Sequence, residues 1–289
     1  MKWSFFVACK IIVNRDSGNC ARLDLDKLIC TLGCEDAQIE NITKATDWSA
    51  DGYDTVVVCG GDGTLHHAID KCQSKQIIYA PCGTLNETSA TAKSLKTVGK
   101  VNGESFSYVC ACGSFTEIGY AVENRRKQRW KSIAYLPQIL KQYRCHEIAA
   151  TLNVDGKIFT KDSYTLLMVL KSHRCFGFNF NRSYKKNQKL YLLAIKSPGS
   201  DCLKNRAKIF FPFFRVFFCG ISHPMSRKSW FLMPFDKLTL TLEKQQDFCL
   251  DGEKRTLNGV IEISERALDK EIFIIKPPFC RRRKKQKIY

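Results

Sequence analysis

The chain has 289 residues, of which 44% are hydrophobic and 26% charged, which excludes a disordered or fibrous protein and suggests two domains. It contains 46 Lys and Arg against 28 Asp and Glu, so its formal net charge is +18, and six of the positive charges lie in the last nine residues. The +12 that remains on the rest of the chain indicates a polyanionic partner, whether a nucleotide, a nucleic acid or an anionic membrane surface.

The first hundred residues alternate apolar, β-branched runs with amphipathic segments. The run 55–59, Thr-Val-Val-Val-Cys, is bounded by turns and is typical of a strand buried on both faces. Strand, loop and helix repeated in this order predict a parallel sheet with covering helices. Strands are expected over 5–13, 37–42, 55–59 and 77–80, and helices over 21–32, 65–72 and 85–95.

After about residue 105 the pattern changes to successive strands with short turns, which favours an antiparallel sandwich. Asp155-Gly156 is a hairpin signal between two of these strands. We therefore predict an α/β nucleotide-binding domain over 1–105, a β-sandwich domain over 106–280 and a basic tail over 281–289. A helix is expected over 126–143, and strands over 147–154, 157–170, 189–195, 237–242, 248–250, 259–263 and 271–275.

Fifteen cysteines are scattered along the chain without any C-x-x-C pair, and only five histidines accompany them. This spacing does not suit zinc, so the cysteines are expected to be small buried residues of a protein in the reducing cytoplasm. Lys10 interrupts the apolar start of the chain, which favours a strand there over a cleaved leader. No run of 18 apolar residues is present, so no transmembrane helix is expected.

Three polar, glycine-containing loops follow three of the predicted parallel strands, at 14–19, 60–64 and 81–86. Loops at the carboxyl ends of parallel strands share one edge of the sheet, where ligands bind. Glycines let the backbone approach a phosphate closely, and the start of the following helix attracts the phosphate charge. Asp62 lies within the second loop, and a carboxylate beside phosphates implies either a Mg²⁺ ion between them or proton transfer.

The second loop, Gly60-Gly61-Asp62-Gly63-Thr64, also fits an ordinary strand-to-helix turn capped by aspartate. A five-residue match of this kind arises by chance in such a chain with odds on the order of 10⁻³ or less, from glycine usage alone. A P-loop and a G-x-G-x-x-G fingerprint are both absent from the sequence, so neither of those nucleotide sites is expected.

Five motifs in order resemble the diacylglycerol kinase-like lipid kinases of the bacterial soluble type, a family related to sphingosine kinases. Together they extend over about residues 5–275. The motifs are Asn14-x-x-Ser17-Gly18, Gly60-Gly61-Asp62-Gly63-Thr64-Leu65, Pro81-x-Gly83-Thr84-x-Asn86-Glu87, Gly113-Ser114-Phe115-Thr116-Glu117 with Ile133-Ala134-Tyr135-Leu136, and Leu250-Asp251-Gly252-Glu253.

The resemblance implies an ATP- and Mg²⁺-dependent kinase acting on diacylglycerol or a similar lipid alcohol, with its active site between the two domains. Asp251 and Glu253 would face the nucleotide, and one of them, with Glu253 favoured, would deprotonate the lipid hydroxyl. Asp62 would also be catalytic, and Asp62 with Glu87 would be the Mg²⁺ ligands. The implied nucleotide-binding residues are Asn14, Ser17, Gly18, Thr43, Gly60, Gly61, Asp62, Gly63, Thr64, Gly83, Thr84 and Asn86.

Several positions depart from the family pattern. Arg15 replaces the usual proline, and His66-His67 replaces the usual Asn-Glu pair. Members of the family place acidic residues before the strand expected at 189–195, where they hold a structural Mg²⁺, but this chain has Lys185-Lys186-Asn187-Gln188 there. Two alternatives therefore stay open: a small-molecule kinase such as an NAD kinase, which shares the Gly-Gly-Asp-Gly loop, and a nucleotide-binding member with weakened catalysis.

Residues 208–219 are conspicuously aromatic and have basic neighbours. The segment suits either an interfacial helix or a helix packed on the sandwich. With the basic tail it predicts peripheral contact with an anionic membrane at the inner face of the cell, where each charge near the surface contributes about 1 kcal/mol. No nucleic-acid-binding motif accompanies the charge, so no nucleic-acid partner is expected.

Overall fold

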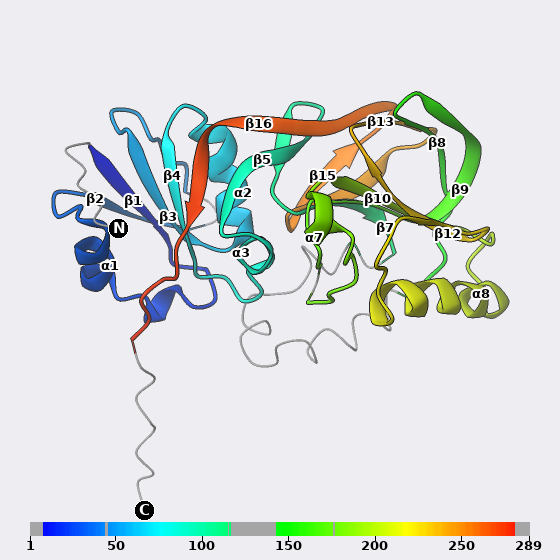
Figure 1. The fold of residues 1–289 in the computed structure, drawn as a ribbon, viewed down its shortest axis with the longest axis horizontal. Helices are drawn as coiled ribbons and strands as arrows, with labels where there is room; N and C mark the ends of the chain where they lie inside the picture. Colours follow the sequence, from blue (N-terminus) through cyan, green and yellow to red (C-terminus); the bar gives the residue numbers. More distant parts are fainter. Residues whose placement is uncertain (1–7, 44–45, 115, 117–142, 176, 281–289) are drawn as a thin grey trace, which may run out of the picture.

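The computed structural model describes residues 8–43, 46–114, 116, 143–175 and 177–280 (Figure 1). The helix predicted over 126–143 falls outside these residues except at its last position. The Ala-Tyr-Leu stretch at 134–136 and the basic tail also lie outside them.

The first half is a parallel sheet in the order β2-β1-β3-β4, as the strand, loop and helix pattern predicted. Successive residues of its central strand enter different cores: Val56 packs on the side of α2, and Val57 packs on the side of α1. The sheet is therefore covered on both faces. The elements are β1 (Cys9–Asn14), η1 (Cys20–Arg22), α1 (Leu25–Leu32), β2 (Gln38–Ile42), β3 (Thr55–Gly60), α2 (Asp62–Lys71), β4 (Gln76–Pro81) and α3 (Glu87–Thr91).

The second half is built from antiparallel strands around a core of alternating apolar residues. The longest central strand, β9, pairs with β8 along its first part and with β7 along its last part, so it joins the two layers. The predicted α/β domain followed by antiparallel β structure is confirmed. The elements are β7 (Val109–Gly113), β8 (Ile148–Val154), β9 (Lys157–Leu170), α7 (Tyr184–Asn187), β10 (Leu190–Lys196), α8 (Leu203–Phe213), η3 (Phe214–Phe218), β11 (Met225–Ser226), β12 (Trp230–Phe235), β13 (Lys237–Leu242), β14 (Gln246–Leu250) and β15 (Glu253–Leu257).

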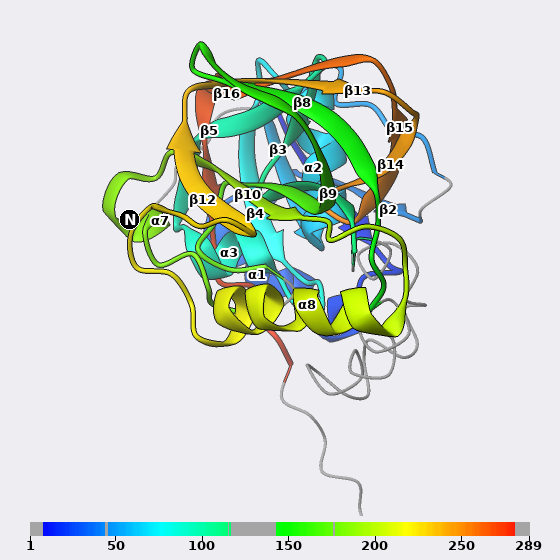
Figure 2. The same cartoon turned by 90° about the vertical axis from the view of Figure 1, so that its right-hand side faces the viewer.

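One long strand, β16 (Val260–Ile274), links the two halves (Figures 1 and 2). Its start pairs with β13 in the second half, and its end pairs in parallel with β4 in the first. The sequence predicted two separate strands here, because the polar run between them is typical of a turn. Instead the run stays extended along β5, with an irregular register between Ala267 and Ile272. The chain therefore recrosses the domain boundary predicted at residue 105.

The predicted helix over 85–95 is also shorter than expected, because α3 ends at Thr91 and the chain then forms β5 (Ser94–Val101). β5 pairs with β16 and with the short strand β6 (Glu104–Phe106). Gly99 of β5 lies opposite Phe106, whose fully buried ring covers the glycine. A Cβ atom on Gly99 would come within 2.1 Å of that ring.

Gly99→Ala is therefore expected to lower the free energy of unfolding by about 1–3 kcal/mol, the usual cost of an overpacked core. Chemical denaturation followed by circular dichroism measures this effect. Lys96→Ala is the control, because Lys96 is exposed on the same strand. Equal stability of the two variants would contradict the expectation.

Candidate active site

The three glycine-containing loops meet at one edge of the parallel sheet, as predicted. Gly61 and Gly83 approach so closely that a Cβ on Gly83 would lie 2.8 Å from the Cα of Gly61. A Cβ on Gly18 would lie 2.5 Å from Thr84 Oγ1. Glycine is needed at these positions because the backbone of one loop touches the backbone or a side chain of the next, and a larger residue would separate the loops.

Hydrogen bonds fix this contact between the loops. Asn19 donates from its backbone N–H to the carbonyl of Cys82 (2.7 Å) and from its side chain to the carbonyl of Gly83 (2.7 Å). The N–H of Gly61 donates to Ser17 Oγ (3.1 Å). Asn86 has a left-handed backbone (φ 48°), and its side chain donates to the carbonyl of Gly83 (3.0 Å).

Two residues predicted to bind the nucleotide, Asn14 and Thr43, lie beside the sheet edge where the three loops meet. Asn14 donates from its side chain to Thr64 Oγ1 (2.8 Å), which ties the end of β1 to the first turn of α2. Thr43 is exposed, and its hydroxyl lies 3.0 Å from that of Thr46. Arg15, which replaces the family proline, is exposed and donates to Asn41 Oδ1 (2.6 Å).

Asp62 caps the start of α3, the helix after the next loop. Its carboxylate accepts the N–H groups of Glu87 (2.7 Å) and Thr88 (3.2 Å). Burial raises the pKa of Asp62 to about 6, against the opposing hydrogen bonds of Glu87 and Thr88, and the charges of Asp251 and Glu87 raise it further. Asp62 thus holds the second and third loops together.

The second half brings Glu253 to this edge. A Cβ on Gly63, in the first turn of α2, would lie 3.1 Å from Glu253 Oε1. Because α2 is ten residues long and begins at Asp62, this carboxylate lies beside the positive end of the helix dipole. The Asp-Gly-Glu turn and the Gly60–Thr64 loop, which were predicted to meet, are therefore adjacent in the structure.

Asp251 is buried and is held differently from Glu253. Its carboxylate accepts three successive backbone N–H groups, those of Ser107, Tyr108 (3.0 Å) and Val109 (3.1 Å). Asp251 itself has a left-handed backbone (φ 49°). The turn that carries Glu253 is thus fixed to the beginning of β7.

His66, one turn along α2, is buried between the carboxylates of Glu104, in β6, and Asp251, in the second half. Its Nε2 lies 3.0 Å from Glu104 Oε1, and its Nδ1 lies 3.6 Å from Asp251 Oδ2. Glu104 is also paired with Arg255, at 2.6 Å from Nη2. Burial disfavours the imidazolium, but the negative charge of Asp251 and the hydrogen bond and charge of Glu104 outweigh it and raise the pKa of His66 above its usual value. His67 is exposed.

Glu87 also joins the two halves. Its buried carboxylate accepts the N–H of Gly177 (2.6 Å) and pairs with Arg174 Nε (2.6 Å). Burial raises the pKa of Glu87, and Arg174 opposes that rise. Of the two carboxylates predicted to hold Mg²⁺, Glu87 thus already has a cationic partner. Among the described residues, no three His, Cys, Asp or Glu side chains gather as a metal cluster.

The segment where the family holds a structural Mg²⁺ has a lysine ammonium close to it. Lys171 is buried, pairs with Glu265 and donates to the carbonyl of Gln188 (3.2 Å), just before β10. A cation of the protein's own therefore lies against that carbonyl. That the missing acidic residues put the structural Mg²⁺ site in doubt stays a prediction.

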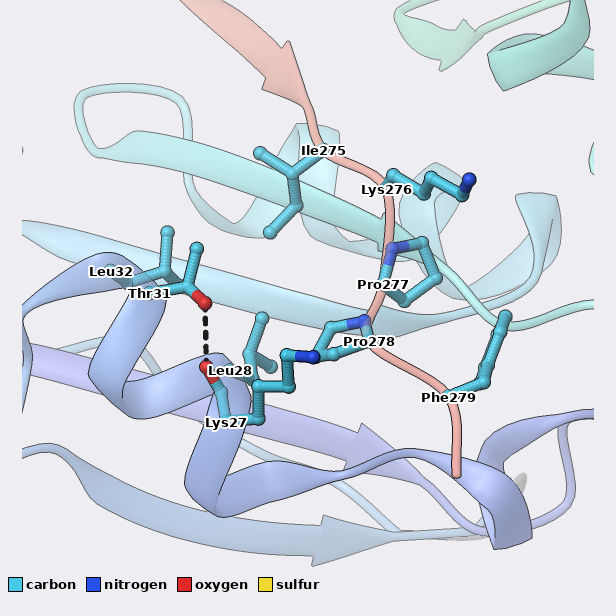
Figure 3. Close-up of a pocket in the computed structure, with 9 residues that line it drawn as sticks. All are labelled: Lys27, Leu28, Thr31, Leu32, Ile275, Lys276, Pro277, Pro278 and Phe279. Atoms are coloured by element: carbon cyan, nitrogen blue, oxygen red, sulfur yellow. Dashed lines mark hydrogen bonds between the residues drawn. The ribbon is translucent and has the colours of Figure 1, made fainter. Parts of the chain in front are cut away.

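A separate groove of about 510 Å³ lies between α1 and the extended segment after β16 (Figure 3). Leu28 and Lys27 of α1 face Pro278 and Phe279 across it. It shares no residue with the glycine loops or with the Asp-Gly-Glu turn. The groove is thus distinct from the candidate active site.

The sequence analysis missed Glu104 and Arg174, which hold His66 and Glu87. Glu104 is 38 residues from His66, and Arg174 is 87 residues from Glu87, so no local pattern pairs them. Only the burial of His66 and Glu87, which the fold reveals, indicates that each needs a charged partner.

The comparisons with known proteins agree with the fold and with the motifs. A family model of the diacylglycerol kinase catalytic domain matches residues 9–109, so the resemblance that the motifs indicated is confirmed. No curated protein matches the sequence.

Solved structures extend the likeness in fold to most of the chain. A protein of Bacillus anthracis str. Sterne, provisionally assigned as a diacylglycerol kinase, is 16% identical with a TM-score of 0.66, over 95% of this chain and 99% of its own. Another structure from the same organism, with the same provisional assignment, is 17% identical with a TM-score of 0.66, over 94% of this chain and 99% of its own. At these identities the likeness concerns the fold alone.

The raised pKa of His66 gives a prediction for stability. A folded pKa above the unfolded value, near 6.5, means that the imidazolium stabilises the fold fully below about pH 6.5. That contribution is lost as the pH rises through the raised folded pKa. His66→Gln cannot titrate, so its deficit in the free energy of unfolding should be larger at pH 5.5 than at pH 8.5, measured by urea denaturation at each pH. A deficit that is independent of pH would contradict this account.

Proposed function

We propose that the protein is an ATP-dependent lipid kinase that phosphorylates diacylglycerol or a similar long-chain alcohol. The observation that carries the proposal is the approach of Glu253 to Gly63 across the two halves of the molecule. Phosphoryl transfer needs a group that orients or deprotonates the acceptor next to the groups that hold the phosphates. Here the two come from opposite halves and meet at the first turn of α2.

The nucleotide would bind along the interlocked loops. The N–H groups at the start of α2 and the close glycine backbones of Gly61 and Gly83 suit a triphosphate. Mg²⁺ in kinases is held by one or two carboxylates together with substrate phosphates, and Asp62 fits that role at the sheet edge where the three loops meet. When bound, the ion would neutralise phosphate charge, and Asp62 would be its protein ligand.

Glu253 is the proposed base. Its carboxylate would take the proton of the acceptor hydroxyl while the hydroxyl oxygen forms a bond to the γ-phosphorus and the bond to the β-phosphate oxygen breaks, releasing ADP. Asp251 is less suited, because three backbone N–H groups already donate to its oxygens and fix its orientation. We assign Asp251 the role of holding the turn in place.

The assignment is tested by transfer of label from [γ-³²P]ATP with Mg²⁺ to diacylglycerol in mixed micelles. Glu253→Gln should lower kcat by at least about 10²-fold, the scale of a lost general base, while ATP binding by calorimetry persists. Glu262→Gln is the control, because Glu262 is exposed on β16 and pairs with Lys237. Label on NAD in detergent-free buffer would favour the small-molecule alternative. ATP binding without any phosphoryl transfer would favour the other alternative, a nucleotide-binding family member with weakened catalysis.

Gly63→Ala tests the contact itself. The added methyl group would lie 3.1 Å from Glu253 Oε1, which requires the carboxylate to move by a few tenths of an ångström. Alanine favours the helix, so the melting temperature should not fall. We expect kcat to drop by roughly tenfold or more, since small misplacements of reacting groups are costly.

The double variant Gly63→Ala/Glu253→Gln completes this experiment. If the methyl group acts by displacing Glu253, the double variant should be no slower than Glu253→Gln alone. Fully additive losses would show that Gly63 acts on something other than this carboxylate.

A further inference from the structure

The helix α8 and the π-helical turn η3 that follows it carry two opposite faces. Ile209, Phe213 and Val216 are buried against the second-half sheet, where they join the core of β9, β10 and β12. This spacing of three to four residues is the packed face of an ordinary amphipathic helix. The sequence left two roles open for the segment, and the structure gives this face the packing role.

The outward face is aromatic. Phe210, Phe214 and Phe218 are 60%, 43% and 65% exposed, and Phe211 is 66% exposed. The first three lie four residues apart and form a ladder of stacked rings, with centroids 5.9 Å and 5.5 Å apart. Leu203 extends the same stripe at 84% exposure. Most of the exposed large apolar residues of the described chain lie on this one face.

The surroundings of this face are strongly basic. Residues 202–235 contain no Asp or Glu but six Lys and Arg. Lys204, Lys208, Phe211 and Arg215 form the stripe next to the aromatic ladder, by the helical spacing of three to four residues. Lys204 and Lys208 are exposed, whereas Arg215 is half-buried and donates to the carbonyl of Gly220.

We infer that this outward face of α8 and η3 docks the protein onto an anionic lipid bilayer. An aromatic stripe lies at the depth of the acyl boundary, while long basic side chains beside it reach the charged headgroups. The helix would lie in the plane of the surface, since none of the helices in the described chain is long and apolar enough to cross a membrane. α8 lies along the lower side of the second half in both views (Figures 1 and 2).

An anionic surface fits better than an apolar protein partner because charge and aromatic rings occur together. A second copy of this chain would bring another +18 and a like-charged face against this one. The inference deepens the proposed function, because a bilayer would present the lipid alcohol, but it does not depend on catalysis.

Binding to vesicles tests the inference on the full chain, without ATP. At 0.1 M salt the protein should sediment with vesicles of phosphatidylglycerol and phosphatidylcholine at least tenfold more tightly than with phosphatidylcholine alone. Phe210→Ser/Phe214→Ser/Phe218→Ser should weaken binding to the anionic vesicles at least tenfold. Lys204→Gln/Lys208→Gln should weaken it several-fold and reduce its salt dependence.

The matched control is Ile39→Ser/Ile158→Ser/Val260→Ser, which removes three exposed apolar residues, 41%, 68% and 60% exposed, from other faces. It should bind vesicles within about twofold of the unchanged chain. Circular dichroism melting confirms that each variant is folded. Glu253→Gln should also bind vesicles normally, so a failure of docking and a failure of the proposed kinase activity are distinguishable.

Three results would overturn the inference. If the phenylalanine variant bound vesicles like the unchanged chain, the attraction to the vesicles would come from another part of the chain, for example the basic tail. Equal binding to neutral and anionic vesicles would remove the role of charge. The unchanged chain could instead bind no vesicles and form a concentration-dependent dimer that only the phenylalanine variant abolishes. That result would show that a second copy of the chain covers this face.

Discussion

The geometry of the site depends on one buried carboxylate, which accepts hydrogen bonds from three backbone N–H groups. Asp251 receives the amides of Ser107, Tyr108 and Val109, and so joins the turn after β14 to the first residues of β7. Because α2 packs beside this corner through His66, the Asp-Gly-Glu turn lies next to the Gly60–Thr64 loop. Glu253 then lies close to Gly63 at the first turn of α2.

The parts of the site that follow a strand directly could be predicted from the sequence. The glycine loops share an edge because parallel strands end there, and their glycines are required because Gly61 and Gly83 touch. The partners of His66 and Glu87 could not be predicted, since Glu104 and Arg174 are distant in sequence and belong to no periodic pattern. The continuity of β16 was hidden for a related reason: the polar run 264–270 suggests a turn, and only pairing with β5 keeps it extended.

Near each of two segments that depart from the family pattern, a nitrogen lies among oxygen atoms. Where the pattern has an asparagine, His66 lies between Asp251 and Glu104, one helical turn from the Gly60–Thr64 loop. Before β10, where the pattern has acidic residues, the Lys171 ammonium contacts the carbonyl of Gln188. The two contacts differ in what they join: His66 places α2 beside the Asp-Gly-Glu turn, whereas Lys171 and Gln188 both lie in the second half.

The shared strand β16 has a consequence for how the protein is made. The edge of β4 is completed only by residues 273–274, and the segment 278–280 then hydrogen-bonds to Arg22 and Asp24 beside α1. During synthesis on a ribosome, the β4 edge of the nascent first half therefore stays unpaired until residue 274 has emerged. Unpaired edges attract other chains. This topology makes the interval before β16 emerges the period in which folding and aggregation compete.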